Sequence, residues 1–173
     1  MARFIERMRS LFEDFLALLA EAYQRAGQAP KAAPIVQRME QLLRPRDEEP
    51  TFDEAARLAW FHLITQPDAA KALQYAQKAA QMQPEDPIAQ RVLGAAKMES
   101  GQAASGVERL SKLAEKDVFA SVLLARHYLA RSEAPRAREA VQRAAALTRS
   151  GPAFRRVREV AQSLSMTLEP RMP

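Results

Sequence analysis

One stretch of this sequence occurs twice. Residues 23–42 read YQRAGQAPKAAPIVQRMEQL and residues 128–147 read YLARSEAPRAREAVQRAAAL, so the same phrase recurs 105 positions later. A recurrence of this kind is the signature of a repeat architecture, and a distance of three times about 35 residues indicates two further repeats between the copies. The residues common to both copies are Tyr23/Tyr128, Ala29/Ala134, Pro30/Pro135, Ala32/Ala137, Val36/Val141, Gln37/Gln142, Arg38/Arg143 and Leu42/Leu147.

Aligning the small residue in the second helix of each repeat divides the chain into four repeats. They span about 13–46, 53–86, 87–117 and 118–151 of a single domain, 1–173, and a capping helix follows at about 152–165. The step of 34 residues between the second and third repeats, with two helices in each, resembles the tetratricopeptide repeat (TPR) family. The clearest matches to that pattern are Leu16, Leu19, Ala20, Tyr23, Gly27 and Ala32 in the first repeat, and Leu124, Ala125, Tyr128, Ala137, Val141 and Ala144 in the fourth.

The resemblance implies a right-handed α-solenoid in which each repeat buries its apolar face against its neighbours. The second repeat departs from the pattern, because Trp60 stands where a residue the size of Gly is expected. Either Trp60 faces a widened gap, filled from the link 44–50, or the register of that helix differs by a residue or more. The third repeat has Gly106 where Ala is usual.

Local signals support an all-α fold. Thr51 followed by Glu54 predicts a capping box at the start of a helix, and Asp68 is placed to cap the next one. The dipeptides Asp86-Pro87 and Gly151-Pro152 place proline in a first turn, where its missing N–H costs nothing. Alternating β-branched runs do not occur, so no strand is predicted.

Composition narrows the class of protein further. With 173 residues, 47% hydrophobic and 27% charged, the chain matches an ordinary globular domain. The absence of Cys excludes disulfides and thiolate metal sites. Glu13 and Asp14 interrupt the apolar N-terminal run, which is therefore not a secretory signal, and we expect a cytoplasmic protein.

Positive charge is concentrated in the second half of the chain. Residues 87–173 hold 15 Lys and Arg against 8 Asp and Glu, whereas residues 1–86 hold 11 against 13. A positive field attracts acidic peptides, nucleic acid or anionic lipid. A basic patch at the C-terminal end, read either as a binding surface or as the solvated face of the cap, comprises Arg149, Arg155, Arg156 and Arg158.

No constellation for catalysis is evident. His62 and His127 are the only histidines, and neither has a metal-ligand partner at the required spacing. Glycine-rich phosphate loops do not occur. The acidic run 47–49 lies between prolines and is interpreted as a solvated linker. We therefore expect no enzyme activity, no metal and no cofactor.

The TPR resemblance implies a concave groove that binds a partner peptide through the first helix of each repeat. Three of the family's contact positions carry arginine, which can fork onto carboxylates, and others carry apolar residues that either anchor a peptide or belong to the core. The groove residues implied are Arg57, Phe61 and Ile64 in the second repeat, Ile88, Arg91 and Met98 in the third, and Phe119, Val122, Arg126 and Leu129 in the fourth.

The leading hypothesis is a non-catalytic scaffold that binds an acidic or amphipathic protein segment or assembles with copies of itself. An alternative is that the basic end binds anionic membrane or nucleic acid. A third hypothesis is that the N-terminal helix, with Arg3, Arg7 and Arg9, dimerises or lies on a bilayer instead of docking on the first repeat. The small type III secretion chaperones resemble the chain in size but tend to be acidic. The absence of Asn argues against the carboxylate clamp of chaperone-tail binders.

Overall fold

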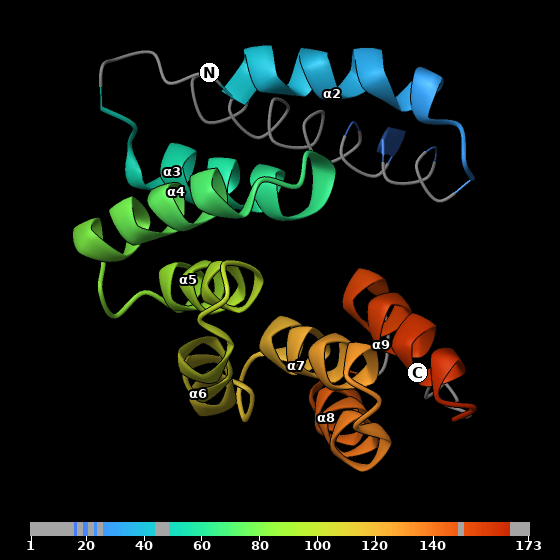
Figure 1. The fold of residues 1–173 in the computed structure, drawn as a ribbon. Coiled ribbons are helices and arrows are strands. Elements are labelled where there is room, and N and C mark those ends of the chain that lie inside the picture. The colour runs from blue at the N-terminus through green and yellow to red at the C-terminus, as the bar shows by residue number, and fades with distance from the viewer. Residues whose placement is uncertain are drawn as a thin grey trace. The chain divides into compact units, whose positions relative to one another are not determined.

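The computed structural model describes Leu16, Leu19, Ala20, Tyr23 and residues 26–43, 49–148 and 151–166. These residues form eight α-helices and one π-helical segment, and no strand occurs among them (Figure 1). The all-α prediction is confirmed for this part of the chain. The elements are α2 (Ala29–Leu43), α3 (Phe52–Trp60), η1 (Phe61–Thr65), α4 (Ala69–Met82), α5 (Pro87–Glu99), α6 (Ala103–Leu113), α7 (Val118–Ala130), α8 (Ala134–Leu147) and α9 (Gly151–Ser163).

Successive helices pack in pairs, as expected for a helical repeat array. α3 packs on α4, α5 on α6, and α7 on α8, while α9 contacts both helices of the last pair. The contacts divide the chain into two compact units, an N-terminal unit (Met1–Pro84) and a C-terminal unit (Glu85–Pro173). The division falls between the second and third predicted repeats.

Side-chain caps explain where four of these helices, α3, α4, α5 and α7, begin. Thr51 Oγ1 accepts from the Glu54 N–H while the Glu54 carboxylate accepts from the Thr51 N–H, which is the predicted capping box. Asp68 caps α4 as predicted. Pro87 lies in the first turn of α5, also as predicted, and Asp86 caps that helix. Asp117 caps α7 by accepting from the Ala120 N–H at 3.0 Å. α9 begins at Gly151, one residue before the predicted start, and has Pro152 in its first turn as predicted.

The turns within pairs use left-handed backbone. Gly27 has φ +69° and Gly101 has φ +85°, and both occupy turns between helices. Ser132 stands at the position of Gly27 in the second copy of the duplicated phrase and has φ +60°. A non-glycine residue in this conformation costs roughly 1–2 kcal/mol, so the second copy keeps the turn at an energetic cost.

The N-terminal unit has a core of mixed side chains. Leu16, Met39, Leu43, Leu58 and Phe61 are buried together, so the described part of the N-terminal segment packs on α2 and α3. The predicted first helix otherwise lies outside the described residues, as do Arg3, Arg7 and Arg9 of the dimerisation and bilayer hypothesis. A second buried cluster is made of alanines from α3 and α4: Ala55, Ala56 and Ala79.

The C-terminal unit is built around small residues and a few branched ones. Gly94 of α5 and Gly106 of α6 face each other so closely that a Cβ added at Gly106 would lie 2.5 Å from the Gly94 carbonyl oxygen. Leu110, Leu124 and Val141 are almost completely buried. The core includes α9, which contributes Val157, Val160 and Ala161, and it includes Leu164 directly after that helix.

The π-helical segment resolves the anomaly at Trp60. α3 begins at Phe52, as α5 begins at Pro87 and α7 at Val118, so the fully buried Ala59 matches Gly94 and Ala125. The predicted register, which opened at Asp53, is therefore one residue late in α3. In η1 the Gln66 N–H donates to the Phe61 carbonyl five residues back, at 2.9 Å. This extra residue makes α3 plus η1 one residue longer than α5 or α7, and the predicted register is correct after it.

Candidate interaction surface

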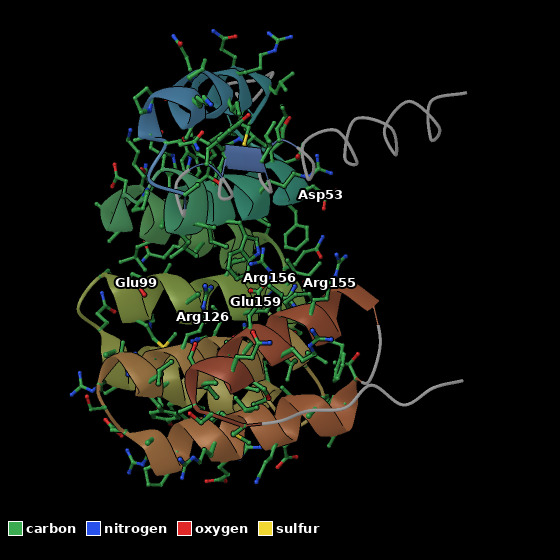
Figure 2. All side chains as sticks on the ribbon, turned by 90° about the vertical axis from the view of Figure 1, so that its right-hand side faces the viewer. Asp53, Glu99, Arg126, Arg155, Arg156 and Glu159 are labelled. Atoms are coloured by element: carbon green, nitrogen blue, oxygen red, sulfur yellow. The ribbon has the colours of Figure 1, made fainter. Side chains whose placement is uncertain are left out.

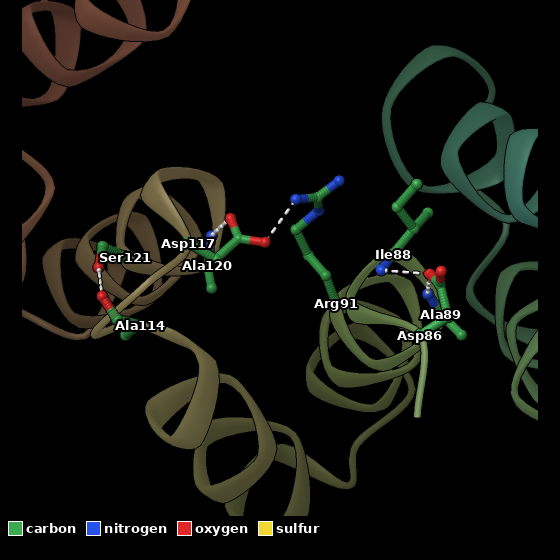
Figure 3. Close-up of polar contacts among 8 residues, drawn as sticks. All are labelled: Asp86, Ile88, Ala89, Arg91, Ala114, Asp117, Ala120 and Ser121. Carbon is green, nitrogen blue, oxygen red and sulfur yellow. Dashed lines mark hydrogen bonds and ion pairs between the residues drawn. The ribbon is translucent and has the colours of Figure 1, made fainter. Parts of the chain in front are cut away.

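The most developed polar site of the C-terminal unit joins α5 to the start of α7. Arg91 Nη1 donates to Asp117 Oδ2 at 2.5 Å, and both side chains are largely buried, 17% and 12% exposed (Figure 3). The same carboxylate caps α7 through its other oxygen. The Arg91 guanidinium carbon also lies 5.3 Å from the centroid of the Phe119 ring, within the range of a cation–π contact. Arg91 is therefore held in place, and its charge is offset by Asp117.

Large apolar side chains remain exposed beside this pair. Ile88 is 41% exposed and lies one turn before Arg91 on α5, while Phe119 is 44% exposed on α7. Both belong to the predicted binding residues, and neither is part of the core. We call Ile88, Arg91, Phe119 and Arg126 the α5–α7 surface.

Arg126 is exposed on α7, two turns after Phe119. It has no ion pair or hydrogen bond in the part of the chain that the structure describes. The spacing of seven residues puts it on the same side of the helix as Phe119. It is therefore the one arginine of this surface whose charge is not offset by a described carboxylate.

Three other predicted binding residues of this unit serve packing. Val122 is 7% exposed and belongs to the core. Met98 and Leu129 are half-buried and pack against the same cluster. The structure thus places only part of the predicted set on an accessible surface.

The predicted residues of the N-terminal unit separate in the same way. Phe61 is 2% exposed and packs with Leu58 and Met39, so for this residue the core interpretation holds. Ile64 is 40% exposed. Arg57 is half-buried, and the register shift aligns it with Val92 and Leu123 instead of Arg91. The expected equivalence of Arg57 and Arg91 was wrong because the prediction did not include the inserted residue.

His62 is buried in η1. Its ring is parallel to that of Tyr75, 5.9 Å away, and meets Phe61 edge-on. Nδ1 has no hydrogen-bond partner in the described part of the chain. Burial lowers the pKa of His62, and Lys71 adds to the effect, although a hydrogen bond with the Gln66 backbone and the carboxylates of Asp68 and Glu40 oppose it. Burial thus favours the neutral form of the imidazole.

The other residues considered for chemistry also contact neighbouring side chains. His127 is half-buried beside Tyr128, with the ring centroids 5.7 Å apart. Glu49, the described residue of the acidic run, pairs with Lys78 at 2.7 Å. Among the residues described, no group of three or more His, Asp or Glu is arranged to hold a metal ion.

Three arginines of the basic patch, Arg155, Arg156 and Arg158, lie on α9. Arg155 and Arg158 are exposed, and Arg156 pairs with Glu159 at 3.5 Å. Arg149 lies outside the described residues. Phe154, the aromatic residue next to these arginines, is only 5% exposed and points into the core.

Comparison with known proteins finds no match among protein-family models and none among curated proteins. No helix formed by the described residues has the length and apolar character needed to cross a membrane.

The sequence did not reveal Asp117 as the partner of Arg91, because the two residues are 26 positions apart and meet only when α5 and α7 are adjacent. The signal available was the position of Asp117 directly before a helix, which predicts a cap but not an ion pair. The paired glycines at 94 and 106 were each noted, but their contact depends on how α5 crosses α6.

Proposed function

We propose that this protein is a non-catalytic interaction module of the TPR type, and that its α5–α7 surface binds a protein segment with large apolar residues. The sequential helix pairs, the left-handed turns and the recurring buried small residues at Ala59, Gly94 and Ala125 support the repeat type. The buried polar residue that could take part in chemistry, His62, packs between Phe61 and Tyr75, and this packing accounts for its burial.

One observation carries the choice of surface. Phe119 is 44% exposed although the Arg91 guanidinium lies over its ring and is paired with Asp117. An aromatic side chain held rigidly at the surface loses little conformational entropy when a partner covers it, and such residues dominate binding energies at interfaces. Ile88, one turn from Arg91, extends the apolar area.

Site-specific photocrosslinking tests the proposal. A benzophenone amino acid placed at position 119 is expected to crosslink partner proteins. An excess of the unmodified protein should compete for these partners and reduce the crosslinking. The same probe at Leu147, which is 39% exposed on α8, is the matched control. An unlabelled Ile88→Asp competitor should displace these partners poorly. Equal crosslinking at both positions, or full competition by Ile88→Asp, would show that another surface binds them.

A further inference from the structure

The last helix, α9, was expected to serve as a polar cap with a solvated face. Its inner side does close the C-terminal unit, because Phe154, Val157 and Val160 are buried there. However, α9 packs directly on α7, the helix that carries Phe119 and Arg126. Figure 2 shows the labelled side chains of Arg126, Arg155 and Arg156 in one view of these two neighbouring helices. The cap therefore carries arginines on a helix that contacts α7.

The available positive charge lies toward α9. Arg91 is offset by Asp117 at 2.5 Å, whereas Arg126 and Arg155 are exposed and have no ion pair or hydrogen bond among the described residues. Arg156 shares its charge with Glu159 at 3.5 Å. A ligand passing from Phe119 along α7 would thus meet an apolar area first and the guanidinium group of Arg126 about two helical turns later.

We infer that α7 and α9 together form a carboxylate-binding surface, Arg126, Arg155 and Arg156, for the acidic part of the same protein segment whose apolar residues dock at Ile88 and Phe119. The inference rests on the proposed function, because it names the chemistry of the segment bound there. Guanidinium groups bind carboxylates through two parallel hydrogen bonds, which gives both orientation and affinity.

The structure favours spaced carboxylates over other anions. Nucleic-acid surfaces stack bases on exposed aromatic rings, but Phe154 is buried. Membrane-surface helices insert large apolar side chains, and none is exposed among the described side chains of α9. Glu159 lies among the arginines, which opposes a dense row of phosphates but leaves room for single carboxylates.

The test uses fluorescence anisotropy with a labelled synthetic peptide of about 15 residues, long enough as a helix to cover about 20 Å. It carries Phe and Leu one helical turn apart, followed by four Glu residues that are separated from one another by Ala. A second peptide has every Glu replaced by Gln. At about 0.15 M salt we expect the Glu peptide to bind roughly tenfold more tightly than the Gln peptide, since electrostatic contacts at exposed sites are screened but not abolished.

Charge-reversal variants show which arginines cause the preference for the Glu peptide. The double variant Arg126→Glu/Arg155→Glu should remove the preference for the Glu peptide, whereas Arg131→Glu/Arg138→Glu makes the same charge change on exposed residues outside α7 and α9 and should keep it. Phe119→Ala should weaken both peptides equally. An unchanged preference in the first variant, or its loss in the control, would contradict the inference.

The outcomes separate the two proposals. Equal binding of the Glu and Gln peptides, with both weakened by Phe119→Ala, refutes the carboxylate surface and leaves the proposed function standing. No effect of Phe119→Ala refutes the proposed apolar site. Failure to bind the Glu peptide, or tighter binding through the same arginines to a single-stranded oligonucleotide or to vesicles with about 30% phosphatidylserine, also overturns the inference.

Discussion

Replacing Gly106 by Ala should destabilise the C-terminal unit although Ala is the better helix former. A Cβ at this position would lie 2.5 Å from the Gly94 carbonyl oxygen and 2.8 Å from the Met98 backbone nitrogen. Both contacts are to the backbone of α5, so no rotation of a side chain can relieve them. The two helices would have to move apart, which would loosen the contact around Leu110.

The expected change in the free energy of unfolding is the sum of two opposed contributions. Gly-to-Ala in a helix interior gains about 1 kcal/mol in propensity. Forcing an extra carbon into a close-packed contact costs about 1–3 kcal/mol, and the backbone contacts place Gly106 at the upper end of that range. The expected net loss is about 2 kcal/mol, or a fall in Tm of about 10 °C for a unit of this size. Gly94→Ala should cost less, because its Cβ would meet Leu110 side-chain atoms at 2.8 and 2.9 Å.

Urea unfolding followed by circular dichroism measures the loss, and hydrogen exchange in the peptides of α5 and α6 localises it. Ala104→Gly, at an exposed position of the same helix, provides the propensity scale and should cost about 1 kcal/mol. If Gly106→Ala were neutral or stabilising while Ala104→Gly behaved as expected, the close approach of α5 and α6 would be wrong.

Three further outcomes are expected. Because burial lowers the pKa of His62 below its ordinary 6.5, the unfolded chain binds the proton more readily, and the stability reported by Trp60 fluorescence should fall as pH drops below about 6.5. His62→Phe should flatten that dependence. Ser121→Ala removes the 2.8 Å hydrogen bond to the Ala114 carbonyl and should cost about 1 kcal/mol in urea unfolding (Figure 3). Thr51→Ala removes one half of the capping box and should lower Tm, with a cost of about 1 kcal/mol.

Features that depend on a few adjacent residues were predictable from the sequence. The caps at Thr51 and Asp68, the first-turn Pro87 and the turn at Gly27 are found where the sequence placed them, because each is determined by residues within four positions of it. Helix capping depends on residues three or four positions apart, and the sequence patterns used to predict caps cover the same few positions.

The π-helical segment could not be placed in this way. One inserted residue changes which face of the helix each later residue occupies. In an analysis based on periodicity alone, the insertion is visible only as one large residue, Trp60, at a position where a small residue is expected. The signal that was available is the pair Leu58-Ala59, which matches Leu93-Gly94 and Leu124-Ala125 and would have moved the register by one.

The duplicated phrase explains why packing was easier to predict than binding. Its shared or matching positions bury the same face in both copies: Ala32 and Ala137 are buried, as are Met39 and Ala144, while Gln37 and Gln142 are exposed. The residues of the α5–α7 surface all lie outside both copies. Contacts within a helix pair are the same in each copy of the pair, so the residues that make them are repeated in the sequence and can be recognised there. The ion pair of Arg91 with Asp117 and the exposed Phe119 occur once, so only the assembled helices bring them together.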